Sequence, residues 1–547
     1  MKTLVPTLLA IFSFICFAFT PKGQAVSPPP EGGYPGGNTA EGHLALASLN
    51  TSAGLYNTAV GVYSVLSLTD GNFNTGVGAG TLFASTADEN TATGAGALFS
   101  NTTGAFNTAN GAFALFSNTD GSSNTAIGIE ALLSNTTGGQ NTAGGELALV
   151  SNTDGNANTA IGADAMQANT QGDSNTAIGA LALLLNTTGS RNTATGFQAL
   201  FSNTTDDNAA YGYHALLDNT TGTSNTATGT QALMSNTTGQ ANTATGFHTL
   251  QSNTLGNENT ASGQSALSSN TIGYSNTATG SFALNNNTEG FGNTANGGAT
   301  LLSNTTGNFN TAYGHSALPN NTTGSLNTAS GFAALQNNST GSNNVALGLQ
   351  AGKNATTGDG NVYIGAGMQG VAGESNACYI ASIFGQTSAS GIPVLVNSSN
   401  RLGTTTSSKR FKEDIKPMGA VSEALFSLTP VTFQYKKEID PAGTSQLGLV
   451  AEDVERVNPD LVVRDKEGKP YSVRYDQVNA MLLNEFLKDH RKVKQQEATI
   501  AQLRQDFQSK LAEQEKKIET LIKGFEKVDA ELDGTKPAPT RVAVNVP

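Results

Sequence analysis

The chain has 547 residues, with 28 Lys and Arg against 41 Asp and Glu and a formal net charge of −13. This balance argues against a nucleic-acid partner, because proteins that bind nucleic acid present a basic stripe to the phosphates. The cations are also unevenly distributed, since only Arg191 and Lys353 lie between Asn38 and Asn400. The C-terminal part therefore holds nearly all the Lys and Arg.

Residues 1–25 are typical of a secretory signal peptide. Lys2 supplies the positive start, residues 4–19 form an apolar run, and residues 23–25 (GQA) form a small-x-small cleavage site. The run is shorter than the roughly 20 residues that a membrane span needs, and no later stretch is apolar enough. We therefore expect a secreted or bacterial cell-surface protein without a membrane span in the mature chain. Cys378 is then the one remaining cysteine, which excludes an internal disulfide framework.

A Pro/Gly-rich segment, residues 26–37, predicts a linker without regular structure. Residues 38–395 then repeat with a period of about 17 residues in roughly 20 copies, a typical unit being NTAIGIEALLSNTTGGQ at 124–140. Two apolar pieces, 126–127 and 131–133, are each followed by turn residues, and the frequent Gly, Asn and Thr disfavour a helix. The repeat predicts a mainly β protein, a parallel β-solenoid with two short strands per coil. At about 4.8 Å per coil the rod would be ~100 Å long.

Each repeat supplies only one or two large apolar side chains, such as Leu132, too few to fill a wide coil. We therefore expect a narrow coil packed against two copies of itself in a homotrimer. The segments NTAIG (124–128), NVALG (344–348) and NVYIG (361–365) resemble the heads of trimeric YadA-type adhesins and of related phage tail fibres. The resemblance covers most of residues 38–395, and it implies a trimeric parallel β-solenoid.

Ladders of identical Asn and Thr side chains leave other functions open for the rod. An uncleaved repeat protein could bind a glycan or ice through these ladders. A solenoid that degrades a glycan is disfavoured, because no clustered carboxylate pair interrupts the repeat. Sequons such as Asn135 are interpreted as turn residues rather than glycan acceptors. His214, His248 and His315 fall on different coils, so they predict no metal site.

The hexapeptide SSKRFK, residues 407–412, marks the change from the repeat to a charged sequence. A serine hydroxyl becomes nucleophilic when a base takes its proton, and a lysine amine is such a base once burial or nearby cations lower its pKa. Ser407 and Lys412 are the candidate pair, with Arg410 as a cationic neighbour. The expected cleavage is beside Ser407, at the carbonyl of Thr406. Taken alone, the hexapeptide is more typical of a solvated hinge.

The sequence from Ser407 onward resembles the peptidase S74 family, the intramolecular chaperones at the ends of phage endosialidases and tailspikes. The similar segments follow one another in order: 407–415 (SSKRFKEDI), 424–425 (AL), 429–435 (TPVTFQY), 447–454 (LGLVAEDV), 458–462 (NPDLV) and 473–476 (VRYD). The family pattern Ser-Asp-x-Arg-x-Lys implies Ser407 as nucleophile and Lys412 as its base, with Ser408 in the place of Asp. The resemblance implies a small α+β chaperone domain at 405–482 that cleaves its own chain once.

A helix with apolar residues three and four apart is predicted for 483–532. Its apolar positions are Leu483, Phe486, Val493, Ile500, Leu503, Phe507, Leu511, Ile518, Leu521, Phe525, Val528 and Leu532. The spacing predicts a coiled coil in which His490, Glu497 and Gln514 are polar core positions that fix the register. Residues 533–547 predict a disordered tail.

These features together predict a trimeric fibre or adhesin with a self-cleaving chaperone. Long parallel solenoids fold slowly, because every coil must find its register. A C-terminal module would hold three chains in register, and cleavage would then remove it. We expect a cell-surface or glycan target, and no cofactor, metal or nucleic acid.

Overall fold

The computed structural model describes residues 34–386 and 388–534. They belong to two compact units, divided between residues 386 and 387. The predicted signal peptide, most of the predicted linker and residues 535–547 of the tail lie outside the described residues. No helix in the described part of the chain combines the length and the apolar character that a bilayer crossing requires.

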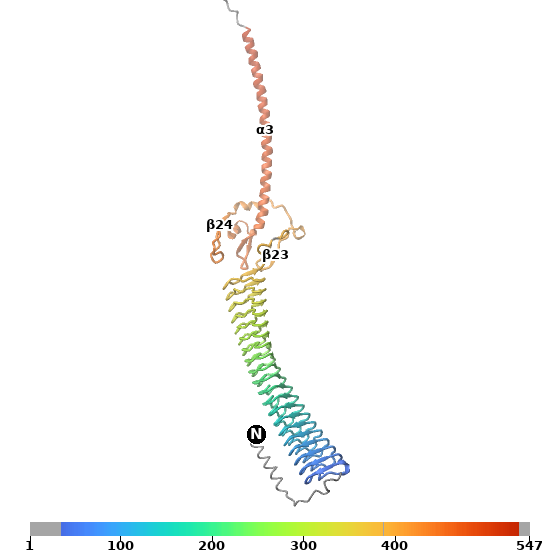
Figure 1. Ribbon diagram of the computed structural model, residues 1–547. Helices are drawn as coiled ribbons and strands as arrows, with labels where there is room; N and C mark the ends of the chain where they lie inside the picture. The colour runs from blue at the N-terminus through green and yellow to red at the C-terminus, as the bar shows by residue number, and fades with distance from the viewer. Residues whose placement is uncertain (1–33, 387, 535–547) are drawn as a thin grey trace, which may run out of the picture. The chain divides into compact units, whose positions relative to one another are not determined.

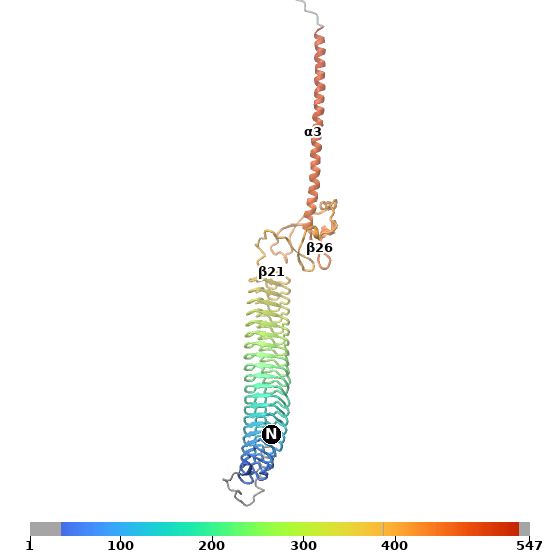
Figure 2. The same ribbon diagram turned by 90° about the vertical axis from the view of Figure 1, so that its right-hand side faces the viewer.

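The first unit is a β-solenoid, the rod of stacked coils in Figures 1 and 2. One 21-stranded parallel sheet runs along it, and each strand has three residues. Thr125 pairs with Thr142 and Ala126 with Ala143, a register that recurs from coil to coil. The predicted parallel β-solenoid of about 17 residues per coil is therefore confirmed. The strands are β1 (Thr39–Glu41), β2 (Thr58–Val60), β3 (Thr75–Val77), β4 (Thr91–Thr93), β5 (Thr108–Asn110), β6 (Thr125–Ile127), β7 (Thr142–Gly144), β8 (Thr159–Ile161), β9 (Thr176–Ile178), β10 (Thr193–Thr195), β11 (Ala209–Tyr211), β12 (Thr226–Thr228), β13 (Thr243–Thr245), β14 (Thr260–Ser262), β15 (Thr277–Thr279), β16 (Thr294–Asn296), β17 (Thr311–Tyr313), β18 (Thr328–Ser330), β19 (Val345–Leu347), β20 (Val362–Ile364) and β21 (Cys378–Ile380).

Each coil has one strand, so the prediction of two strands per coil is wrong. The predicted second strand, residues 131–133, forms tight turns, in which Leu133 N donates to Glu130 O at 3.2 Å. Glu130 and Leu132 have φ values of 58° and 54°, in the left-handed region. A left-handed conformation costs a residue with a side chain about 1–2 kcal/mol. The turn directs Leu132 inward, where it is fully buried, and this burial offsets the backbone cost.

The interior of a coil is filled by its own chain. Ala126, Ala131 and Leu132 have no exposed surface, and the equivalent residues of neighbouring coils pack with them in one continuous core. The coil is thus narrow, as expected, and the small number of large apolar side chains does not by itself require a trimer. Small alanine side chains and buried amides close a narrow coil without help from a partner.

Two ladders of buried Asn side chains run through this interior. Asn124 Oδ1 accepts from the backbone N–H of Asn141 at 2.9 Å, and Asn124 Nδ2 donates to Gly138 O at 2.8 Å. In the second ladder, Asn135 Nδ2 donates to Asn118 Oδ1 at 2.7 Å and to Gly138 O at 2.8 Å. One glycine carbonyl thus joins both ladders. A side chain at Gly138 would clash, because its Cβ would lie 2.5 Å from the backbone of the next coil.

The burial of the Asn ladders corrects one expectation about the rod surface and agrees with the interpretation of the sequons as turn residues. Asn side chains cannot bind a glycan or ice, because their amides are buried and are used between coils. For the same reason the sequon at Asn135 presents no acceptor in the folded rod. The Thr rows remain at the surface, and Thr136 Oγ1 in the turn donates to Thr153 O of the next coil at 2.9 Å.

Both ends of the solenoid depart from the repeat. Near the first coil, residues Pro35–Gly37 form a 3-10 turn, which corrects the prediction of an unstructured linker at this point. Asn38 Nδ2 stabilises that turn by donating to Pro35 O at 2.8 Å. Near the last coil, Tyr363 takes the place of the buried strand alanine and stacks on Tyr379 at 5.7 Å between ring centroids.

The second Asn ladder stops before the last coils. Asn338 Oδ1 is buried and has no hydrogen-bond partner among the described residues. The cause is Ala355, which occupies the position of the next ladder asparagine and is also buried. The ladder therefore ends on an unsatisfied carbonyl oxygen.

The second unit is built from three small hairpins and a long helix around a small core. The core residues are Val454, Leu461, Val462, Val473 and Met481. The hairpins pair β22 (Val394–Val396) with β23 (Leu402–Thr404), β24 (Val431–Phe433) with β25 (Gln446–Gly448), and β26 (Val462–Arg464) with β27 (Pro470–Val473). The helices are α2 (Ala451–Val457), α3 (Tyr475–Asp533) and the 3-10 helices Lys409–Phe411, Val421–Ser427 and Pro459–Leu461. The predicted α+β arrangement with a long C-terminal helix is confirmed.

Candidate functional site

Ser407 and Lys412 lie at the two ends of a short 3-10 turn, Lys409–Phe411. Lys412 N donates to Lys409 O at 3.2 Å, which turns the chain back toward the serine. The Lys412 ammonium then donates from Nζ to Ser407 Oγ at 3.1 Å. This separation is within the range that proton transfer between a nucleophile and its base requires.

The predicted neighbours of the pair lie close to it. Ser408 N donates to Thr406 Oγ1 at 3.5 Å, a long hydrogen bond that holds the chain on either side of Ser407. The Arg410 guanidinium lies over the Phe411 ring, 4.6 Å from its centroid. Arg410 thus makes a cation–π contact, while Lys412 makes the contact with Ser407.

The whole segment from residue 401 to residue 417 is exposed in the single chain. A lysine amine acts as a base only when burial or nearby cations remove its proton. The geometry of a nucleophile–base pair is thus present, and the dry surroundings that would activate it are not supplied by this chain alone.

A second contact between serine and lysine, which the sequence analysis missed, lies at the start of α3. Ser422 is fully buried; its hydroxyl donates to Glu485 and accepts from Asn484 Nδ2 at 2.6 Å. Lys488 Nζ lies 2.7 Å from Glu485 Oε1 and 3.4 Å from Ser422 Oγ. We call Ser422, Asn484, Glu485 and Lys488 the polar clamp. The one sequence signal is the i, i+3 spacing of Glu485 and Lys488, because Ser422 lies 63 residues before Glu485.

The electrostatics of the polar clamp indicate a structural role. The hydrogen bond with Lys488, together with that from Ser422, lowers the pKa of the Glu485 carboxyl. The same bond with Glu485, aided by Glu423, raises the pKa of Lys488. Lys488 therefore keeps its proton and cannot serve as a base, so the clamp fastens the 3-10 helix Val421–Ser427 to α3.

Large apolar side chains are exposed along α3. Phe486, Phe507 and Phe525 are 67%, 69% and 72% exposed. The other exposed apolar residues of the predicted pattern are Leu483, Val493, Ile500, Leu503, Leu511, Ile518, Leu521, Val528 and Leu532. An open groove of about 680 Å³, lined mainly by apolar residues such as Leu447 and Leu482, continues this surface onto β24 and β25.

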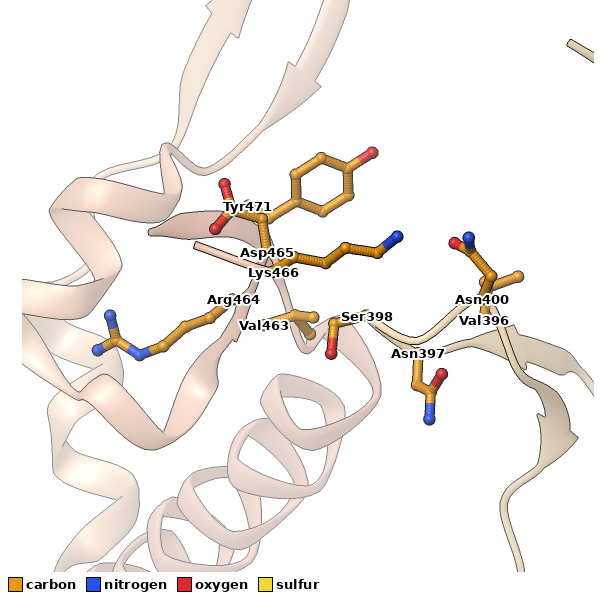
Figure 3. Close-up of a pocket in the computed structure, with 9 residues that line it drawn as sticks. All are labelled: Val396, Asn397, Ser398, Asn400, Val463, Arg464, Asp465, Lys466 and Tyr471. Carbon is orange, nitrogen blue, oxygen red and sulfur yellow. The ribbon is translucent and has the colours of Figure 1, made fainter. Parts of the chain in front are cut away.

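A smaller pocket of about 250 Å³ lies between the β22–β23 and β26–β27 hairpins. Figure 3 shows Lys466 extending toward the loop that carries Asn400, while Arg464 points away from that loop. Asp465 Oδ1 accepts from the backbone of Lys469 at 2.8 Å and so belongs to the β26–β27 turn. The pocket thus brings the hairpin before Ser407 beside the hairpin before α3, and it holds no acid pair of the glycosidase kind.

Comparison with known proteins gives one match. Residues 407–463 match the model of the Peptidase_S74 family, described as "Chaperone of endosialidase". No significant match was found among the curated proteins or among the solved structures. The matched segment begins at Ser407 and includes Lys412 and Ser422, whereas Glu485, Lys488 and most of α3 lie beyond it. The chain thus carries a Peptidase S74 segment, of the kind described as a chaperone of endosialidase, C-terminal to a long parallel β-solenoid.

Proposed function

We propose that the protein is the subunit of a trimeric, secreted or surface-exposed fibre, whose C-terminal unit assembles three chains and is then released by cleavage beside Ser407. The S74 segment behind a β-solenoid supports a protein of the tail-fibre type. The observation that carries the cleavage is the 3.1 Å contact between Lys412 Nζ and Ser407 Oγ, at the first residue of the matched segment.

Assembly is supported by the exposed apolar face of α3. A 59-residue helix with aromatic residues such as Phe507 more than two-thirds exposed is costly in water unless another copy covers them. Residues three and four apart on that face are the pattern by which parallel helices pack as a coiled coil. Three copies are the number that the S74 and YadA-type resemblances imply.

The cleavage is an acyl transfer. The Ser407 hydroxyl oxygen attacks the carbonyl carbon of Thr406, and the Lys412 amine takes the hydroxyl proton. The C–N bond between Thr406 and Ser407 breaks as the amide nitrogen receives that proton, which leaves Thr406 joined to Ser407 Oγ as an ester. Water then hydrolyses the ester, releasing the Thr406 carboxylate and a fragment with Ser407 at its N-terminus.

Assembly and cleavage are linked through the surroundings of Lys412. The amine is exposed in one chain, so a second copy must cover it before it can lose its proton. Trimers therefore form first and are cut afterwards. The cut separates the finished rod from the unit that aligned it. Rods that came apart after the cut would then have no unit to align them again.

The test is the intact mass of the purified full-length protein and of four variants. Wild type is expected to give fragments ending at Thr406 and beginning at Ser407. Ser407→Ala is expected to stay whole, and Lys412→Met to cleave about 10²- to 10⁴-fold more slowly, the usual contribution of a positioned base. Ser408→Ala and Lys409→Met are the matched controls, because they remove a serine hydroxyl and a lysine amine from other positions of the same hexapeptide. Both variants are expected to cleave. Cleavage of Ser407→Ala at the wild-type rate would refute the mechanism.

A second candidate function is binding of a repeating surface, a glycan or ice, through the Thr rows. Strands β12 to β15 expose their first and third residues, which include Thr226, Thr228, Thr243 and Thr245. These residues pair in register, so their hydroxyls repeat at the strand spacing of about 4.8 Å. Thermal hysteresis of the rod, abolished by Thr226→Val with Thr243→Val, would support ice binding, and its absence in wild type would exclude it.

A further inference from the structure

One row of the solenoid surface is apolar over most of the rod. It is formed by the tenth residue of each coil, counted from the asparagine that precedes the strand, and we call it the outer stripe. Its apolar members are Leu66, Phe83, Phe99, Phe116, Leu133 and Val150, followed after Gln167 by Leu184, Phe201, Leu217 and Met234. Closer to β21 the row is mixed, with Gln251, Ser268 and Asn285 in succession, then Leu302 and Pro319, and finally Gln336 and the charged Lys353.

Backbone hydrogen bonds hold successive members of the outer stripe above one another. Ser117 N donates to the carbonyl of Leu133 at 3.0 Å, and the same bond recurs in neighbouring coils. The rings of Phe83 and Phe99 stack with centroids 4.8 Å apart, and those of Phe99 and Phe116 with centroids 5.1 Å apart. From Leu66 to Leu133 the side chains are half-buried and form a continuous apolar ridge, and Val150 in the next coil is buried.

The charges of the rod favour a contact between copies along this ridge. Acidic residues far outnumber the two cations of the repeat, Arg191 and Lys353, so two rods repel each other over most of their surface. No Asp or Glu lies in the outer stripe. The residue after each stripe member is small in the first coils, for example Ser100 after Phe99 and Ser134 after Leu133, which lets another surface approach closely.

A second copy of the same chain is the occupant that fits this pattern best. Chains aligned in parallel by α3 present identical coils to each other at every height. Apolar stripe residues near Phe99 then face apolar ones, and polar ones near Ser268 face polar ones, without any further matching. A different partner would need its own surface to change from apolar to polar at the same height along the rod.

We propose that the rods of a trimer contact one another through the outer stripe, most tightly over residues 66–150 and 184–234. The proposal rests on the proposed function, because α3 supplies the parallel alignment. It also gives that function a consequence: the contact between rods survives the cut beside Ser407. The released fibre therefore stays trimeric without the unit that assembled it.

The first experiment is site-directed cross-linking of the uncut chain. Leu133→Cys and Ile127→Cys are placed separately in a Ser407→Ala chain in which Cys16 and Cys378 are replaced by serine. Both positions are aliphatic and lie in one coil, and Ile127, on the strand face, is 51% exposed. A short bismaleimide is expected to join Leu133→Cys chains into covalent dimers and to leave Ile127→Cys chains single.

The outcomes separate the two proposals. A particle that light scattering finds monomeric would refute the proposed assembly, and the stripe contact with it. Two results with a trimeric particle would refute the stripe contact alone. In the first, Leu133→Cys chains stay single, as expected if a glycan or another partner covers the stripe. In the second, Ile127→Cys chains cross-link as much as Leu133→Cys chains.

The second experiment follows the cleaved rod. Leu133→Asp places a carboxylate in the stripe, and the released fragment is expected to fall from trimer to monomer in sedimentation while the extent of cleavage is unchanged. Ile127→Asp in the same coil is the control and is expected to stay trimeric. A wild-type rod that is monomeric after a complete cut would overturn the inference.

Discussion

The solenoid buries its core leucine side chains, whereas the C-terminal unit leaves comparable side chains on α3 exposed to solvent. Leu132 is fully buried inside its coil, whereas Leu503 on α3 is 60% exposed. The rod completes its core with one chain, and the C-terminal unit has five fully or nearly buried core residues beside a long apolar helix face. The repeat thus buries its large core side chains within one chain, whereas α3 leaves large apolar side chains exposed.

Under the proposed function, this difference explains why a repeat rod would carry a unit that aligns its copies. Every coil presents nearly the same edge, since Thr125 and Ala126 pair with the next coil as their equivalents do elsewhere. Three such rods could therefore pair out of register by a whole coil at little cost. α3 has no such translational symmetry, because the polar positions His490, Glu497 and Gln514 interrupt its apolar pattern.

The largest expected difference between the two units is in the effect of truncating Leu132 in the rod and Leu503 on α3. Leu132→Ala leaves a cavity in a closed core and is expected to lower the free energy of unfolding of the rod by about 2–5 kcal/mol. Leu503→Ala removes no contact within one chain, so it is expected to leave the rod unchanged and to weaken only the association of α3. Guanidinium unfolding followed by circular dichroism at two protein concentrations checks both. The cleaved rod of Leu133→Asp, which is expected to be monomeric, should unfold at the same guanidinium midpoint at both protein concentrations. A midpoint that changes with concentration would contradict the comparison.

The Asn ladders give the next largest effect. Asn135→Ala removes two donated hydrogen bonds and leaves Asn118 Oδ1 buried without its donor, and it is expected to cost about 1–3 kcal/mol. Thr137→Ala, at an exposed turn position two residues later, is the matched control and is expected to change stability little. Equal effects of the two substitutions on the guanidinium midpoint would show that the ladder contributes nothing specific.

The end of the second ladder allows a stabilising change. Ala355→Asn would place an amide opposite the unsatisfied Asn338 Oδ1 and is expected to raise the stability of the last coils by about 1 kcal/mol. Hydrogen exchange of residues 338–364 measures the local gain. Ala351→Asn, at a buried position that faces no orphan oxygen, is expected to destabilise the same segment. Faster exchange in Ala355→Asn would mean that the site cannot accommodate the amide.

The polar clamp should give the smallest effect, and one that depends on pH. The pKa of Glu485 is lowered in the folded chain, so its contribution is complete above the usual glutamate pKa and disappears as the pH falls through the lowered value. Hydrogen exchange of residues 419–427 is therefore expected to accelerate below about pH 4.5, the usual glutamate value. Glu485→Gln is expected to flatten this dependence, and the exposed Glu526→Gln to preserve it. Unchanged acid sensitivity in Glu485→Gln would assign it to other carboxyls.

Much of this architecture could be predicted from the sequence, because spacing alone carries it. The period of about 17 residues predicts the parallel sheet. Apolar residues three and four apart predict a helix over 483–532, whereas α3 begins eight residues earlier, at Tyr475, inside the segment predicted as the chaperone domain. The contact between Ser407 and Lys412 is local, but the hexapeptide alone does not nominate the pair; the ordered resemblance from Ser407 to residue 476 does. Whether that pair cleaves the chain stays a prediction.

The errors have physical causes that spacing does not reveal. Residues 131–133 are apolar like a strand, yet Leu132 adopts a left-handed turn because the coil must close within 17 residues. Asn is ordinarily a surface turn residue, and only the stacked geometry shows that Asn135 finds all its partners inside. The polar clamp joins Ser422 to Glu485 across 63 residues, a separation that no local pattern encodes.

The shared acceptor Gly138 O has a consequence for how such a fibre could vary. Each repeat brings its own acceptor carbonyl and its own two amides, so duplication or loss of one whole repeat in the gene would leave every remaining coil with a complete set. The rod could then be lengthened or shortened in increments of about 4.8 Å, while the C-terminal unit stays unchanged. A repeat of another size must keep such a carbonyl, as the 16-residue repeat after Asn192 does, in which Thr205 O accepts from both Asn192 and Asn203.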